Sequence, residues 1–391
     1  MNKPLLLIIA LLFASIFQDK AQAISHLKSN YENNLYTHFD HTQHYIASSS
    51  VDTIQNLKGF TISTDSIDAF LETRMDSLNI PGLSIAVIND AKVVYHRTMG
   101  YANLEKNTPV SKTTLFEGAS LSKSVFAFFV MSFVEDGKLD LDKPLYEYLA
   151  FPDIEHDNRY KKITARIVLS HRSGFPNWRE NEDDRKLKIK FDPDSTYEYS
   201  GEGYQYLAMV LKHIAKTDWA GLESLFQDRV AVVLGMENTT FLPSEFTQEN
   251  KATPYNNSRV ALDWRNDYWN LKNKGVFVAP SSIHTESTDF SKWMIAMMNK
   301  ELLSENSFEE LFKHHSLITT TSTGINVYYS LGFITADEPY NNTFFHGGSN
   351  AGFTCWYLMD IEKKWGYVVF TNSEYGEKLG DELWDYFERE D

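Results

Sequence analysis

Cysteine is almost absent from this sequence: Cys355 is the only one among 391 residues. A single thiol excludes an internal disulfide. No grouping of cysteine and histidine has the spacing of a zinc site, and there is no His-Glu-x-x-His segment. We therefore expect no metal and no cofactor. Cys355 lies in the apolar stretch 353–359, where a buried thiol that packs as a small hydrophobe is expected.

Positive charge is also scarce, since 37 Lys and Arg stand against 53 Asp and Glu, for a net charge of −16. No cluster of basic residues interleaved with aromatics occurs, so nucleic acid is not expected as a partner. The hydrophobic fraction of 42% and charged fraction of 23% are typical of a globular protein. A small molecule or a peptide is the partner that this composition leaves open.

Long apolar runs are missing except at the N-terminus, where residues 4–17 are almost wholly apolar and follow Lys3. That run is short for a membrane span, and Ala21-Gln22-Ala23 behind it has the small-residue pattern of a signal-peptidase site. We interpret residues 1–23 as a signal peptide, which predicts a periplasmic or secreted protein with no stable membrane span after cleavage. An uncleaved membrane anchor is the alternative.

The remaining chain is expected to form a polar, flexible lead-in over 24–60 and one domain over 61–391. Neighbouring strands joined by tight loops favour an antiparallel sheet flanked by helices, an α/β (α+β) fold, with a mostly helical insert at about 139–275. Hydrophobic periodicity predicts helices over 67–78, 203–215, 287–299 and 379–387, and strands over 84–88, 93–95, 327–334, 353–359 and 367–371.

A further helix is predicted from Ser120 to about Asp136, and its apolar residues cover every face, which indicates a buried central helix. Ser120 and Lys123 are three residues apart and so share one side of that helix. A serine hydroxyl beside a desolvated amine at a helix N-terminus is an arrangement suited to nucleophilic catalysis. Ser25 and Lys28 have the same spacing, but they lie in the lead-in.

Three further motifs follow in order: His171-Arg172-Ser173-Gly174, Tyr199-Ser200-Gly201 and His346-Gly347-Gly348-Ser349. With Ser120-Leu121-Ser122-Lys123, they make the chain resemble the serine β-lactamase and penicillin-binding-protein superfamily from about Asp65 to Phe387. The resemblance is to the branch that contains class C β-lactamases, D-aminopeptidases and esterases. It implies a β-lactamase/transpeptidase-like fold.

The resemblance also implies roles for individual residues. Ser120 matches the nucleophile, Lys123 its partner, and Tyr199 the tyrosine that relays the proton. His346 and Gly348 match the strand that lines the substrate site, and the backbone N–H groups of Ser120 and Ser349 match the oxyanion hole. Which of Lys123 and Tyr199 acts as the base stays open. His171 is interpreted as a structural residue of its turn.

Two departures from the family pattern bear on the substrate. Gly201 stands where the family usually has an asparagine that binds the substrate's amide, and His346 stands where its β-lactamases usually have lysine. We therefore expect a serine hydrolase acting on a D-amino-acid peptide, a cell-wall fragment or an ester, with esters preferred to penicillins. A class C-like β-lactamase and a non-catalytic module that senses peptidoglycan are the alternatives. Gly201→Asn with His346→Lys is expected to raise relative β-lactam activity.

Overall fold

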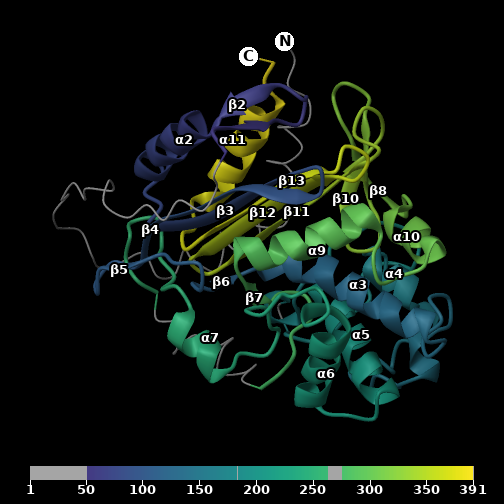
Figure 1. Cartoon of the computed structure of the whole chain (residues 1–391). Coiled ribbons are helices and arrows are strands. Elements are labelled where there is room, and N and C mark those ends of the chain that lie inside the picture. Colours follow the sequence, from purple (N-terminus) through teal and green to yellow (C-terminus); the bar gives the residue numbers. More distant parts are fainter. Residues whose placement is uncertain (1–50, 183, 263–274, 391) are drawn as a thin grey trace.

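A computed structural model describes residues 51–182, 184–262 and 275–390 (Figure 1). The signal peptide and residues 24–50 of the predicted lead-in lie outside the described residues. The main feature is a nine-stranded antiparallel sheet of order β5-β4-β3-β13-β12-β11-β10-β9-β8. Its strands are β3 (Gly82–Asn89), β4 (Lys92–Asn103), β5 (Thr108–Pro109), β8 (Ser316–Thr320), β9 (Asn326–Tyr329), β10 (Ile334–Ala336), β11 (Thr343–Asn350), β12 (Phe353–Asp360) and β13 (Trp365–Thr371).

Strand β13 pairs with β3, which places the first hairpin and the last strands in one sheet as the sequence predicted. Alternate side chains of β3 therefore face opposite sides. Ile85 and Val87 pack with α2 (Thr64–Ser77) and α11 (Gly376–Glu388), whereas Ala86 and Ile88 belong to the core on the side of α9 (Ser287–Asn299). Figure 1 shows α2 and α11 on one face of the sheet and α9 on the other.

Beyond α9 lies the central helix α3 (Ser122–Glu135), whose apolar side chains are buried around nearly its whole circumference, as predicted. The insert packs around it. Its described elements are α4 (Ala165–Leu169), α5 (Gly201–Ile214), α6 (Trp219–Phe226), the π-helical turn η6 (Gln227–Ala231), α7 (Glu245–Asn250) and the 3₁₀ turns η3 (Leu145–Glu147), η4 (Asn158–Lys162) and η5 (Arg179–Asn181). Helix α10 (Glu305–Phe312) follows α9, and a two-stranded pair joins β6 (Phe116–Glu117) to β7 (His284–Thr285).

The antiparallel α/β architecture with a helical insert is therefore confirmed. None of the helices within the described ranges is long and apolar enough to cross a membrane.

Two local predictions are wrong. The lead-in was expected to extend to residue 60, but β1 (Thr53–Gln55) pairs with β2 (Thr61–Ser63), and Ile54 and Leu57 are buried. The segment is polar in composition, but it forms a small hairpin whose apolar residues are buried. The run 327–334 is not one strand, because the chain turns between β9 and β10 and the two strands pair with each other. Leu331 and Phe333 in the turn are buried and so continue the apolar pattern.

Candidate active site

Ser120 lies in a 3₁₀ turn, η2 (Ala119–Leu121), immediately before α3, and not in the first turn of the α-helix that was predicted. The preceding residue, Ala119, is buried and has φ of 41°. A left-handed alanine costs of the order of 1–2 kcal/mol. The turn is held from outside, since Gly118 donates its N–H to the carbonyl of Ile283 at 2.7 Å. The backbone around Ser120 is thus a constrained feature of the fold.

Lys123 is buried one turn along the chain, and its Nζ lies 3.2 Å from Ser120 Oγ. Nζ also donates a hydrogen bond to the carbonyl oxygen of Pro280 at 2.9 Å. Burial lowers the pKa of Lys123 well below its usual value. A neutral amine that donates one N–H to Pro280 keeps a lone pair with which it can accept the Ser120 proton.

Tyr199 is brought to the same place by the loop that leads into α5. The Lys123 Nζ lies 4.5 Å from the centre of the Tyr199 ring. The phenol is buried, and its hydroxyl has no partner of good hydrogen-bond geometry among the described residues. Burial raises the pKa of Tyr199 well above its usual value, and the nearby Ser120 hydroxyl opposes part of that rise. Tyr199 is therefore protonated at neutral pH.

His346 lies on β11 and contacts the same cluster, 6.2 Å from Tyr199 between ring centres. Its Nδ1 is 2.6 Å from the carbonyl oxygen of Gly347, so Nδ1 must donate. Nε2 then accepts a hydrogen bond from the hydroxyl of Tyr329 at 3.0 Å. Burial lowers the pKa of His346 to about 3. His346 is thus a neutral, fully bonded ring, and not a cation, at neutral pH.

Gly348 and Ser349 follow on the same strand, which passes against the turn that carries Ser120. A Cβ atom added to Gly348 would lie 2.9 Å from both the Gly118 carbonyl oxygen and the Ser120 nitrogen, so only glycine fits there. Pairing of β11 with β10 stops at Phe345, which leaves the following residues without a neighbouring strand on that edge. Alternate backbone N–H groups of an antiparallel strand point to that edge. This arrangement suits the predicted oxyanion hole, in which Ser349 supplies one donor.

A family model described as "Beta-lactamase" matches residues 67–387. The chain belongs to the beta-lactamase family. Protein flp of Staphylococcus aureus (strain MW2) is 24% identical over 339 residues, which cover 82% of this chain and 66% of that protein. The chain thus spans just under two thirds of that relative's length. The mitochondrial serine beta-lactamase-like protein LACTB of Mus musculus is 33% identical over 132 residues, 34% of this chain and 24% of that protein.

Two solved structures share the fold of this chain. The octameric penicillin-binding protein homologue from Pyrococcus abyssi has a TM-score of 0.68 at 20% identity and covers 83% of this chain and 77% of its own. D-alanine carboxypeptidase AmpC from Burkholderia cenocepacia has a TM-score of 0.66 at 17% identity, with 81% and 96% covered. At these identities the likeness concerns the fold alone. The family membership and the fold that the motifs suggested are confirmed.

Sequence reasoning missed a buried polar group that joins the two sides of the site. Glu117, three residues before Ser120, forms an ion pair with Lys251 and accepts a hydrogen bond from the side-chain amide of Asn350. Asn350 follows Ser349 on β11, so one carboxylate ties together the segments that carry the two expected oxyanion donors. No motif signals this group, because its members come from three distant segments of the chain.

The structure also shows what lies beside Gly201, the position at which the family usually has an asparagine. A Cβ atom there would lie 2.9 Å from the carbonyl oxygen of Asn177 and 3.0 Å from the nearest carbon of the Trp178 indole. The loop is fastened in place, because Arg179 binds the Glu202 carboxylate through its backbone N–H, Nε and Nη2. In this member of the family, an aromatic ring occupies the space next to Gly201.

Within the described ranges, no group of three or more His, Cys, Asp or Glu side chains could hold a metal ion. The single thiol, Cys355, is buried and donates to the carbonyl of Gly118 at 3.2 Å. Burial raises its pKa well above the usual value. Cys355 therefore packs beneath the Ser120 turn as a protonated thiol.

Proposed function

We propose that this protein is an exported serine hydrolase that cleaves an amide or ester bond through an acyl-enzyme on Ser120. The observation that carries the proposal is the position of Ser120 Oγ, 3.2 Å from the amine of a buried Lys123 whose pKa burial lowers. A serine hydroxyl becomes a good nucleophile only when a neighbouring base takes its proton. A neutral Lys123 is such a base.

In the proposed reaction, the Ser120 proton passes to Lys123 as Oγ attacks the carbonyl carbon. The carbonyl oxygen becomes an oxyanion that the backbone N–H groups of Ser120 and Ser349 stabilise. When the bond to the leaving group breaks, that group takes the Tyr199 hydroxyl proton, and the Lys123 ammonium returns a proton to Tyr199. A water molecule then attacks the acyl carbonyl carbon and gives its proton to Lys123. The bond from that carbon to Ser120 Oγ breaks, and Oγ takes the proton back from Lys123 as the acid product leaves.

The assignment of Lys123 as the base and Tyr199 as the proton donor is supported by burial. Desolvation favours the neutral form of both groups, which is the unprotonated amine for Lys123 and the protonated phenol for Tyr199. The two form a coupled pair in which each starts in the state that its proposed step requires.

For the substrate, we propose an activated ester, a D-amino-acid peptide or a cell-wall fragment, with esters turned over faster than penicillins. Gly201 offers no side-chain amide, and His346 is neutral. A lost hydrogen bond to a neutral group is worth about 0.5–1.5 kcal/mol, and one to a charged group about 1.5–3 kcal/mol. The two together would reduce β-lactam turnover by roughly two orders of magnitude, at about 1.4 kcal/mol for each tenfold.

A substrate panel on the purified protein tests the proposal. A p-nitrophenyl ester, a chromogenic cephalosporin and a set of D-amino-acid amides are compared, with Ser120→Ala as the control. The proposal predicts turnover that Ser120→Ala abolishes, with kcat/KM highest for the ester. A higher kcat/KM for the cephalosporin would indicate a β-lactamase. Labelling of Ser120 by a β-lactam without turnover of any compound would indicate a sensing module.

Export has its own test, since the signal peptide lies outside the described residues. The protein is expressed in a bacterial host and its N-terminal residues are sequenced after fractionation. A mature N-terminus near Ile24 in the periplasmic or secreted fraction is expected. Met1 retained on a cytoplasmic protein would refute the export part of the proposal.

A further inference from the structure

His171, which was interpreted from the sequence as structural, accepts hydrogen bonds from the residues before and after Tyr199. The N–H of Glu198 donates to the His171 carbonyl oxygen at 2.9 Å, and the N–H of Ser200 donates to the ring Nδ1 at 3.0 Å. These donors are the residues immediately before and after Tyr199. The His171 ring also packs on the Tyr199 ring, with centres 4.2 Å apart. Three contacts from one residue thus define where Tyr199 lies.

The backbone at His171 is more strained than the end of a helix requires. Helix α4 ends here, and His171 has φ of 57°. That left-handed position after a helix is usually glycine or asparagine, because other residues are disfavoured there. A histidine therefore carries a conformational cost that glycine would avoid. The residue at this position is nevertheless a histidine, and its ring makes the contacts with the Tyr199 segment.

The hydrogen bond from Ser200 also fixes the chemical state of the ring. Nδ1 accepts an N–H, so it carries no proton, and the neutral imidazole has its hydrogen on Nε2. Burial lowers the pKa of His171 well below its usual value. The ring is enclosed by aromatic neighbours, the rings of Tyr197, Tyr199, Tyr204 and Tyr329. It acts as a fixed support and not as a proton carrier.

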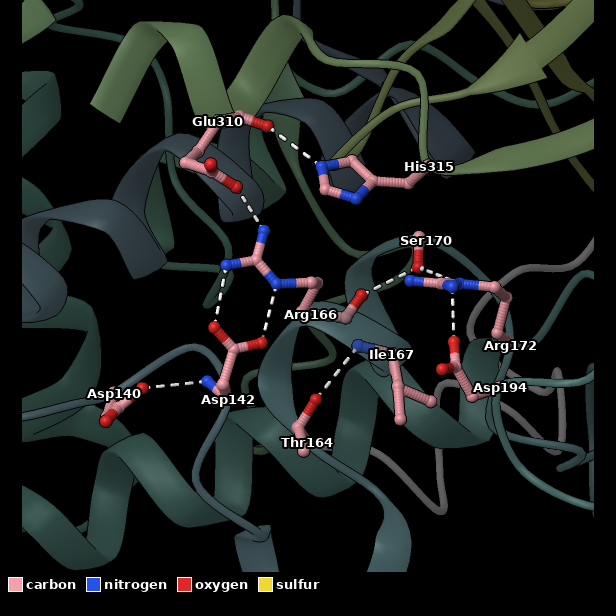
Figure 2. A network of polar contacts seen from close by, with 10 residues as sticks. All are labelled: Asp140, Asp142, Thr164, Arg166, Ile167, Ser170, Arg172, Asp194, Glu310 and His315. Carbon is pink, nitrogen blue, oxygen red and sulfur yellow. Dashed lines mark hydrogen bonds and ion pairs between the residues drawn. The ribbon is translucent and has the colours of Figure 1, made fainter. Parts of the chain in front are cut away.

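The segment on either side of His171 is itself anchored, as Figure 2 shows. Arg166 in α4 binds the carboxylates of Asp142 and Glu310. Arg172, the residue after His171, forms an ion pair with Asp194 and donates from Nε to Ser170 at 2.9 Å. These contacts attach α4 to α10 and to the loop that leads into Tyr199. His171 therefore connects the anchored end of α4 to Tyr199.

We propose that His171 is a positioning residue that holds the Tyr199 hydroxyl at its working place beside Ser120 and Lys123. This inference rests on the proposed function of that site. A catalytic group displaced by about 1 Å can lose on the order of a hundredfold in rate. Loss of the contacts from His171 would allow a displacement of this kind without removing any group that reacts.

The test compares two substitutions of similar size. His171→Asn tolerates the left-handed backbone, and its Oδ1 can accept the Ser200 N–H. His171→Leu has no acceptor. The kcat/KM for an alkyl ester, whose leaving alkoxide must take up a proton, is measured for each variant as the report on acylation of Ser120, with Tm to confirm folding. We expect His171→Asn to remain within about tenfold of the unmodified protein and His171→Leu to fall about a hundredfold. Should His171→Leu fail to fold, His171→Gly, which suits the backbone, replaces it with the same expectation.

The same substitutions in a Tyr199→Phe background distinguish positioning of the Tyr199 hydroxyl by His171 from a general structural role of His171. If His171 acts through the Tyr199 hydroxyl, His171→Leu should slow acylation much less in that background than in the unmodified protein. An equal loss in both backgrounds would overturn the inference, as would unchanged acylation in the single variant. A protein that is not acylated even without substitutions would instead refute the proposed function, and the inference with it.

Discussion

Lys123 donates from Nζ to the carbonyl oxygen of Pro280 at 2.9 Å, a contact across 157 positions of sequence that holds the amine beside Ser120. A carbonyl oxygen can accept from a neutral amine as well as from an ammonium, so this contact does not require the charge. Because burial lowers the Lys123 pKa, the amine is expected to be neutral in the working enzyme. A neutral Lys123 should be visible in the pH dependence of the reaction.

The first prediction concerns the pH dependence of acylation. A base with a lowered pKa is active above that pKa and loses activity as pH falls through it, when the amine takes up a proton. The kcat/KM for a neutral ester should therefore reach its plateau well below pH 10.5 and fall on the acid side. This parameter reports ionisations of the free enzyme. A rate that continues to rise through pH 10 would mean that Lys123 has an ordinary pKa.

The second prediction corrects an expectation drawn from the sequence. The double variant Gly201→Asn, His346→Lys was expected to raise relative β-lactam activity, but a Cβ atom at position 201 would clash with the Asn177 carbonyl oxygen and the Trp178 ring. We now expect Gly201→Asn to lower the free energy of unfolding by about 1–3 kcal/mol, the usual cost of overpacking, with no gain in cephalosporin turnover. Measurements are urea denaturation and kcat/KM.

The matched control for this clash is Gly201→Asn combined with Trp178→Ala, which removes the ring. The remaining contact with the Asn177 backbone should leave part of the destabilisation, and the double variant should be more stable than the sum of the single effects predicts. Purely additive effects would show that Trp178 does not occupy the space beside position 201.

The third prediction concerns acid stability. Burial is the largest cause that lowers the pKa of His96 to about 4, His284 to about 4 and His346 to about 3. Groups with lowered pKa values stabilise the fold above their unfolded pKa, about 6.5, and lose that contribution as pH falls. At pH 5 each of these histidines lowers the free energy of unfolding by about 2 kcal/mol, because each pH unit below 6.5 contributes about 1.4 kcal/mol. Asp381 opposes this, since burial raises its pKa to about 7.

Burial also lowers the pKa values of His171 and His315, and it raises those of Glu223 and Glu286 as it does that of Asp381. Because these five histidines oppose three carboxyl groups, Tm should fall between pH 7 and pH 5 at constant ionic strength. The variant His284→Gln removes one of the titrating groups outside the reacting atoms and should lose less stability over the same range. A Tm that is unchanged or higher at pH 5 would contradict the protonation states assigned to these histidines.

The fourth prediction concerns the ion pair of Glu117 and Lys251, whose side chains are 13% and 4% exposed. Removing one partner of a buried pair leaves an uncompensated charge and typically costs about 3–5 kcal/mol. Lys251→Met should therefore be strongly destabilised. The double variant Glu117→Gln, Lys251→Met should recover most of that loss, as measured by chemical denaturation. A double variant no more stable than Lys251→Met would show that the pair is not coupled.

Much of this structure could be predicted because its signals are local. The helix 287–299 and the hairpin that begins at Ser84 follow from hydrophobic periodicity, and the order of the motifs around Ser120, Lys123 and Tyr199 indicates one family. The turn between β9 and β10 could not be found this way, because its buried residues extend the apolar pattern of the strands.

The surroundings of the site were harder to predict for a different reason. Pro280 contributes a backbone carbonyl, which has no residue signature, and Trp178 matters only through its position next to Gly201. His171 was identified as part of a motif but interpreted as structural. Its two hydrogen bonds to the Tyr199 segment become evident only when the loop and the end of α4 are placed side by side.

The central claim is that Ser120 is the nucleophile, and covalent labelling tests it most directly. The purified protein is incubated with a fluorophosphonate, its intact mass is measured, and the modified peptide is mapped. The account predicts one added phosphonyl group, located on Ser120, and none on Ser120→Ala. An unchanged mass, or equal labelling of Ser120→Ala, would contradict it.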